Sequence, residues 1–274
     1  MVSSIQRVIS LNLGEIEKDS LKYPLSDWKK ILILGILVIL SNMVIINSVN
    51  VMLSAINVLI IYFLIIIGEI IFLFVRGYFI RIIKSSVAGV VGLPEFNSWV
   101  GMMIDGIKFF LVNAVYLIPA ILLIGFGAVL TSNLGIIGSN PSSFPVDLIL
   151  ASGIWGLVAI LYTVIIIPLL LMAIVNMVYN DGEFSAAFRF REILSKISSI
   201  GGIRLIVWYI MTGIIFVIIA FIGIFLFAIL FVNPIIGQIL ILLVLFPYLL
   251  MYFARSVALF YKSSLNRFDD GVCS

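Results

Sequence analysis

The sequence contains no histidine and a single cysteine, and only 11% of its residues are charged. Without histidine, the chain lacks the commonest transition-metal ligand and the commonest general base. Cys273 has no second cysteine to pair with, which excludes a disulfide within the chain. Phosphate-binding glycine loops, nucleophile elbows and paired metal-ligand motifs are absent as well. The sequence therefore predicts a protein that is not an enzyme and that holds no metal and no cofactor.

Apolar residues make up 64% of the 274 residues. Soluble domains carry about 25% charged residues, roughly twice the share found here. The composition thus predicts an all-α integral membrane bundle that forms one polytopic domain over residues 1–274. Within it we expect an N-terminal segment at 1–30, membrane spans over 31–254 and a tail at 255–274.

Long apolar runs recur along the chain, with Glu69 as the one charge inside them, and each approaches the roughly 20 residues that a helix needs to cross the hydrocarbon core. The pattern predicts six transmembrane helices. Their expected limits are Ile31 to Val49, Val51 to Val75, Phe109 to Leu130, Leu148 to Val175, Leu205 to Val232 and Ile235 to Ala254.

The basic residues sort to one side of this predicted topology. All 16 lysines and arginines lie before the first run, between the second and third, between the fourth and fifth, or after the sixth. By the positive-inside rule, both termini and the two longer polar loops are then cytoplasmic, and the protein belongs to the cytoplasmic membrane. Because the basic residues are spread over these segments and form no single face, we expect membrane lipids and not nucleic acid as partners. Protein partners and the oligomeric state stay open.

The second, fourth and sixth runs end alike, with three residues at the same spacing. These sets are Gly68, Phe72 and Arg76; Pro168, Met172 and Asn176; and Pro247, Met251 and Arg255. One interpretation is a unit of polar segment, span, turn and span that occurs three times as hairpin repeats. The alternative is that all even-numbered spans must end at the same interface and so resemble one another.

Polar segments at 23–30, 93–108 and 182–197 precede the odd-numbered runs. Helical spacing of their apolar residues predicts amphipathic elbow helices at the cytoplasmic interface, each setting the angle at which the next span enters the bilayer. Pro94 fits the first turn of such a helix, where its missing N–H costs nothing. The interfacial residues that we predict are Trp28, Pro94, Trp99, Phe184, Phe188, Arg189 and Lys196.

Glu69 is an acid inside a predicted span, seven residues before Arg76. An intramembrane acid is costly and normally faces the bundle interior with a partner. Glu69 could form a proton or cation site in a transport path, or its carboxyl could pair with Arg76 or Arg255 to hold spans together. Asn113 and Asn176 could line a polar path with it, although hydrogen bonding between helices would explain them equally well.

Three stretches resemble a known family: GEIEKDSLKYPLSDWKKILILGIL at 14–37, GYFIRIIKSSVAGVVGLPEFNSW at 77–99 and NDGEFSAAFRFREIL at 180–194. Together they are similar to the archaeal membrane family of domain of unknown function 4013, over nearly the whole chain. The resemblance implies a multi-pass membrane protein. It supplies no catalytic residues.

Two functions fit these observations. The first is transport or handling of a small solute or a lipid within the membrane, motivated by Glu69 and by prolines inside three predicted spans. The second is a membrane scaffold that shapes the bilayer or recruits partners through its elbow helices. A continuous polar cavity that reaches Glu69 would favour the first, and a filled bundle the second.

Overall fold

The computed structural model describes residues 13–52, 58–133, 153–230 and 234–271, and in these ranges the chain is helical without a strand. The long helices are α3 (Trp28–Met52), α4 (Val58–Val87), α5 (Trp99–Asn133), α7 (Ile154–Tyr179), α9 (Gly202–Leu230) and α11 (Phe246–Gly271). The short elements are α2 (Leu13–Lys22), η1 (Pro24–Ser26), η2 (Phe184–Phe188), α8 (Phe190–Ile200), α10 (Pro234–Leu240) and the π-helical η3 (Ile241–Leu245).

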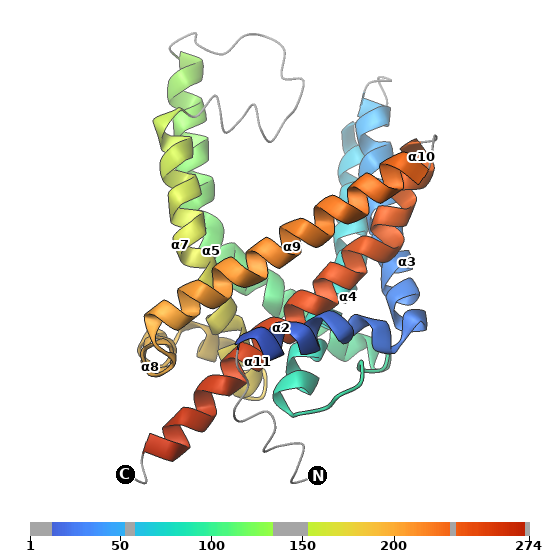
Figure 1. Ribbon diagram of the computed structural model, residues 1–274. Helices are drawn as coiled ribbons and strands as arrows, with labels where there is room; N and C mark the ends of the chain where they lie inside the picture. The colour runs from blue at the N-terminus through green and yellow to red at the C-terminus, as the bar shows by residue number, and fades with distance from the viewer. Residues whose placement is uncertain (1–12, 53–57, 134–152, 231–233, 272–274) are drawn as a thin grey trace.

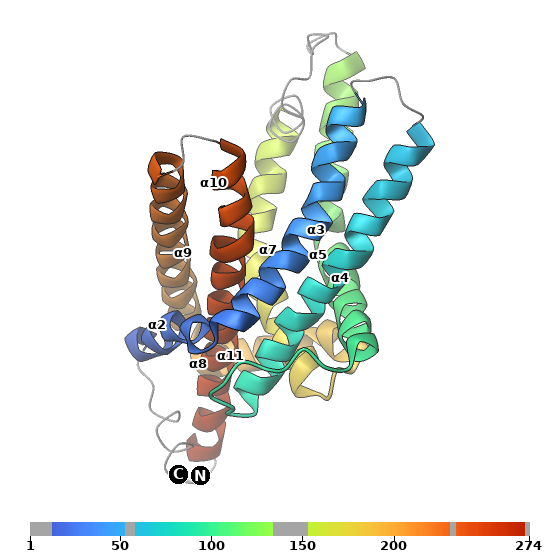
Figure 2. The same cartoon turned by 90° about the vertical axis from the view of Figure 1, so that its right-hand side faces the viewer.

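The long helices form three successive hairpins, α3 with α4, α5 with α7, and α9 with the continuous run from α10 to α11 (Figures 1 and 2). We call the end that carries α2, residues 88–98, η2 and α8 the polar end. Helix α9 starts at this end beside α8 and runs diagonally away from α7 to the other end of the bundle, where it meets α10 (Figure 1). The C-terminal part of α11 descends to the same end as α2.

Five described helices are long and apolar enough to cross a membrane: 62–87, 99–130, 154–179, 202–226 and 236–263. This confirms a multi-span membrane protein but supports five spans, not the six that we predicted. The first predicted span, Ile31 to Val49, falls on α3, and the side chains of its second half lie outside the described part of the chain. A sixth span therefore stays a prediction.

The buried core lies at the polar end. Residues 170–178 of α7 are buried, and so are residues 251–261 of α11 apart from Phe253, which is partly buried. The predicted span six ends at Ala254, yet α11 continues to Gly271, so that the first part of the expected tail is a buried helix. Sequence hydropathy misses this continuation because buried polar residues such as Arg255 and Ser256 interrupt the apolar run.

The elbow predicted at 93–108 is not a separate helix, because residues 93–98 are not helical and residues 99–108 belong to α5. Residues 88–98 contain no helix, and α5 begins only at Trp99, so the prediction that Pro94 lies in a first helical turn is wrong. Side chains from elsewhere bind the backbone of this segment instead. Arg81 donates to the carbonyl oxygens of Glu95 and Ser98, and the Lys30 ammonium donates to that of Leu93. These bonds satisfy the carbonyl groups that a helix would have used internally.

Glycines permit the closest contacts between α4 and α5. A β-carbon at Gly77 would lie 1.8 Å from the Met102 carbonyl oxygen, and one at Gly106 would lie 2.0 Å from the Leu73 carbonyl oxygen. The two glycines thus let each helix rest on the backbone of the other. A similar contact joins α3 to η3, since a β-carbon at Gly35 would lie 2.0 Å from the Leu243 carbonyl oxygen. Pro247 has no N–H to donate to that carbonyl, and the helix widens to π geometry just before it.

Replacing Gly106 by alanine should force α4 and α5 apart. We expect Gly106→Ala to lower the free energy of unfolding by roughly 1–3 kcal/mol, the usual cost of overpacking. Gly125→Ala, on the same helix with no atom within 4 Å of the added carbon, is the matched control and should leave stability unchanged or slightly higher. Thermal unfolding midpoints in detergent measure both. Equal midpoints for the two variants would contradict the close contact.

Candidate functional site

A cavity of about 630 Å³ lies between α4, α5, α7, α9 and α11. Its lining is mostly aliphatic and aromatic, with rings contributed by Phe72, Phe79, Phe109, Tyr209, Phe216, Phe246 and Phe253. Small-molecule sites commonly enclose about 300–1,000 Å³ and combine an apolar wall with a few placed polar groups. The cavity has the size and the lining of such a site.

Five polar side chains lie at the cavity wall: Arg76, Asn113, Thr163, Tyr209 and Thr212. The amide of Asn113 donates to the Phe109 carbonyl oxygen at 2.8 Å, and the Thr163 hydroxyl donates to the Ala159 carbonyl oxygen at 2.7 Å. Each of these two side chains therefore uses its donor group within its own helix. Their oxygen atoms can still accept a hydrogen bond from a molecule in the cavity.

Glu69 and Arg76 lie on one face of α4 and form an ion pair. The Arg76 guanidinium donates to the Glu69 carboxylate at 2.9 Å and lies over the rings of Phe72 and Phe110. Of the two, only Arg76 lines the cavity, and the Glu69 side chain is 46% exposed. Arg255, the other partner that we considered for Glu69, instead contacts Asp19 of α2 at 2.9 Å. The structure thus separates Arg255 from Glu69 and assigns Arg76 to it.

A buried acid that sequence reasoning missed is Glu17 of α2, which is 3% exposed. Its Oε1 accepts hydrogen bonds from the hydroxyls of Thr212 at 2.7 Å and Ser256 at 2.8 Å, and its Oε2 accepts one from the Tyr252 hydroxyl. Glu17 therefore joins α2 to both α9 and α11. A signal was present, because Glu17 follows Ile16 and precedes Ser20 on the stripe of α2 that helical spacing predicts to be buried.

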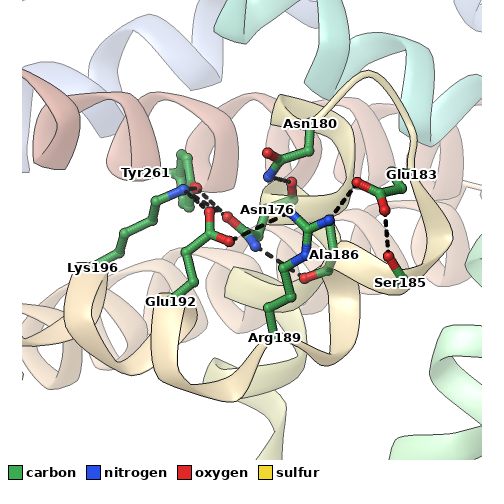
Figure 3. A network of polar contacts seen from close by, with 9 residues as sticks. All are labelled: Asn176, Asn180, Glu183, Ser185, Ala186, Arg189, Glu192, Lys196 and Tyr261. Atoms are coloured by element: carbon green, nitrogen blue, oxygen red, sulfur yellow. Dashed lines mark hydrogen bonds and ion pairs between the residues drawn. The ribbon is translucent and has the colours of Figure 1, made fainter.

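Asn176 is the centre of a second buried network, shown in Figure 3. Its Oδ1 accepts hydrogen bonds from the Lys196 ammonium at 2.7 Å and the Tyr261 hydroxyl at 2.8 Å, and its amide donates to the Ala186 carbonyl oxygen at 2.9 Å. Asn176 thereby fastens α7 to η2, α8 and α11. The arrangement is the interhelical hydrogen bonding that we weighed against a polar path for this residue, and Asn176 does not line the cavity.

Charged side chains at the rim of this network pair with one another (Figure 3). Glu192 lies 2.8 Å from Lys196, and the hydrogen bond from that lysine lowers the pKa of the Glu192 carboxyl. The Ser185 hydroxyl and then Arg189 lower the pKa of Glu183 in the same way. Lys196 is thus directed inward, with 13% of its side chain exposed, while 43% of the Arg189 side chain is exposed.

The other predicted interfacial residues fall into three places. Trp28 is the first residue of α3 and Trp99 is the first residue of α5, and both side chains are exposed. Phe184 and Phe188 belong to η2, where their rings pack edge to face with the ring centroids 5.1 Å apart. The single helix predicted at 182–197 is broken at Arg189 into η2 and α8. The carbonyl oxygen of Pro94 accepts a hydrogen bond from the Tyr78 hydroxyl.

In the described ranges, no three His, Cys, Asp or Glu side chains gather as metal ligands. The cavity offers apolar contact and hydrogen bonds, and the two buried networks fix the helices around it.

Truncating the Asn176 side chain should destabilise the protein, because its buried hydrogen bonds are lost. We expect Asn176→Ala to lower the free energy of unfolding by about 1–3 kcal/mol, because the Lys196 ammonium and the Ala186 carbonyl group lose a buried partner. Asn113→Ala is the matched control, since that amide bonds only within α5. Denaturation in detergent, followed by circular dichroism, gives both values. A cost for Asn113→Ala as large as that for Asn176→Ala would contradict the assignment.

No curated protein and no solved structure matched the chain. A family model matched residues 60–228, which run from α4 to α9 and include most of the cavity wall but neither Glu17 nor α11. By this match the chain belongs to the family described as protein of unknown function (DUF4013).

Proposed function

We propose that this protein takes a lipid-class molecule, apolar with a small polar group, from the bilayer into the cavity, and so serves in the transport or handling of such molecules. The observation that carries the proposal is the cavity of about 630 Å³ with its aromatic wall and few polar groups. A charged solute would have to leave its hydration shell for this wall, whereas a lipid-class molecule would not.

The placement of the polar groups supports the same molecule. Arg76 is already neutralised by Glu69, so the wall presents no unbalanced cation to an anionic solute. Tyr209 and Thr212 of α9 line the wall, and the oxygen of the Thr212 hydroxyl, whose hydrogen is donated to Glu17, can still accept a hydrogen bond from a small polar group. Gly213 beside them leaves space, because no atom lies within 4 Å of a β-carbon built there.

The scaffold alternative receives less support. It would require the polar face of α8 to be offered to a partner, yet Lys196 on this face is directed to Asn176 and Tyr261 within the bundle. The Arg189 guanidinium forms an ion pair with the Glu183 carboxylate, with 2.6 Å between the nitrogen and oxygen atoms. These contacts favour a structural role for α8.

The membrane arrangement belongs to the proposal. We propose that α3 is a sixth span, that the polar end faces the cytoplasm, and that α2 and η2 with α8 lie in the interface as elbows. Support comes from the sequence order, in which every lysine and arginine lies outside the spans in segments predicted to share one side, and from the apolar and polar stripes of α8, with Ile193 and Ile200 buried and Arg191 exposed.

Filling the cavity should weaken lipid binding without disturbing the fold. In Gly213→Leu the added side chain occupies the space beside Tyr209 and Thr212, and we expect roughly tenfold weaker binding of a pyrene-labelled long-chain alcohol, equal to about 1.4 kcal/mol. Energy transfer from tryptophan to pyrene in nanodiscs measures it. Gly125→Leu, on an exposed stretch of α5, is the control. Unchanged binding in Gly213→Leu, or equal loss in both variants, would count against the cavity as the site.

Accessibility labelling tests the orientation. With Cys273 replaced by serine, Val91→Cys, which is 71% exposed at the polar end, should react with an impermeant maleimide only after the membrane is opened. Ser142→Cys, between the third and fourth predicted spans and so on the outer side, should react in intact cells. The reverse pattern would overturn the proposed orientation.

A further inference from the structure

We propose that the cavity selects lipid-class molecules whose polar group donates a hydrogen bond, and that Thr212, oriented by Glu17, makes this selection. The selection rests on the proposed function, because it requires a molecule in the cavity, and it adds the kind of polar group that the molecule carries. Thr212 contacts the bound molecule, whereas Glu17 acts through Thr212 and is a positioning residue.

The polar hydrogen atoms around Glu17 are all donated within one network. The Glu17 carboxylate accepts the hydroxyl hydrogens of Thr212, Ser256 and Tyr252. The indole N–H of Trp208 donates to the Ser256 oxygen at 3.0 Å. The Ser256 oxygen also lies 3.4 Å from the Thr212 oxygen, but the single hydrogen of Ser256 is directed to Glu17. Because a hydroxyl has one hydrogen and two lone pairs, none of these side chains has a hydrogen left for the Thr212 oxygen.

The Thr212 oxygen is therefore an acceptor that no described side chain of this network supplies with a donor. Thr212 is 1% exposed, and it is the member of the network that lines the cavity. A buried acceptor without a donor is unfavourable. A molecule in the cavity that brings a polar hydrogen removes this cost. A molecule that brings only an acceptor oxygen sets lone pairs against lone pairs and does not.

Glu17 determines which way the Thr212 hydroxyl points. A free hydroxyl turns to donate or to accept as its partner requires, but donation to a carboxylate oxygen at 2.7 Å directs this hydrogen to Glu17 and not to the cavity. The carboxylate is 3% exposed and is held by Tyr252 and Ser256 of α11, so it does not turn aside. The same bond polarises the hydroxyl and makes its oxygen a stronger acceptor.

The other polar groups of the wall agree with this orientation. One amide hydrogen of Asn113 on α5 and the hydroxyl hydrogen of Thr163 on α7 are donated to carbonyl oxygens of their own helices, which leaves both side-chain oxygens as acceptors. The Tyr209 hydroxyl can donate or accept and so suits the oxygen of the bound molecule. A long-chain alcohol satisfies these groups, whereas an ether, ester or ketone brings no hydrogen for the acceptors.

Two pyrene-labelled probes that differ in one group test the selection: the long-chain alcohol and its methyl ether, which keeps the oxygen and lacks the hydrogen. In nanodiscs at a fixed ratio of probe to lipid, we expect the wild type to bind the alcohol roughly tenfold more tightly than the ether. Energy transfer from tryptophan measures both affinities.

Variants of Thr212 separate the selection from a general effect on the fold. Thr212→Val keeps the shape and removes the oxygen, so it should weaken binding of the alcohol but not of the ether and bring the ratio of affinities toward one. Thr212→Ser should restore the ratio. Ser263→Ala is the matched control, because it removes a buried hydroxyl of α11 that bonds to the Phe260 carbonyl oxygen, and it should keep the wild-type ratio.

Variants of Glu17 test its positioning role. In Glu17→Gln the amide oxygen still accepts the Thr212 hydrogen while the amide nitrogen faces Tyr252, so the preference for the alcohol should persist. In Glu17→Ala the Thr212 hydroxyl is free to donate to the ether oxygen, and the ether should bind more tightly than it does to the wild type. Damage to the fold predicts no such gain. If circular dichroism shows Glu17→Ala to be unfolded, Glu17→Asp, whose carboxylate ends one methylene short of Thr212, takes its place.

Each failure has its own signature. Equal affinity of the wild type for the two probes, or a preference that Thr212→Val leaves intact, overturns the selection while the cavity remains a lipid site. An unchanged preference in the folded Glu17→Ala or Glu17→Asp variant overturns the role of Glu17 alone. If neither probe binds the wild type, the proposed function fails and the selection fails with it.

Discussion

Buried hydrogen bonds at the polar end of the bundle are the interactions on which the rest of the structure depends. In a bilayer, lipid tails are as apolar as the side chains of a helix, so apolar burial alone does little to bring helices together. Glu17 joins α2 to α9 and α11, and Asn176 joins α7 to η2, α8 and α11. Both networks converge on residues 251–261 of α11, which are buried apart from the partly buried Phe253 and form the central support of the polar end.

The cavity follows from where these bonds lie. Polar contacts and the glycine contact of α4 with α5 hold the helices close at the polar end, while α9 crosses the bundle diagonally away from α7 (Figure 1). The helices diverge above that end, and the space between α7 and α9 is lined with aliphatic and aromatic side chains and not filled by them. Tight packing at one end and a lipid-sized space beyond it are two consequences of the same uneven distribution of hydrogen bonds.

The class of the protein and five of its spans could be predicted from the sequence, because hydropathy reports how a helix meets lipid. The site could not. Glu69 attracted attention since it interrupts an apolar run, yet it forms a local pair with Arg76 near the cavity wall. Glu17 lies among the charges of GEIEKDSLK, where its place beside Ile16 and Ser20 is only a weak signal, and the packing of α2 on α11 buries it. The helix predicted to start at Pro94 was wrong for a related reason. Hydrogen bonds from Arg81 and Lys30, which are distant in sequence, stabilise the segment around Pro94 without a helix.

The central claim is that the space between α4, α5, α7, α9 and α11 holds a lipid-class molecule. An electron cryo-microscopy map of the protein in nanodiscs of native lipid tests it most directly. The account predicts elongated density inside the cavity, between the aromatic side chains and with its polar group near Tyr209 and Thr212. A map in which α9 closes on α7 and side chains fill the space, with lipid density only on the outer surface of the bundle, would contradict it.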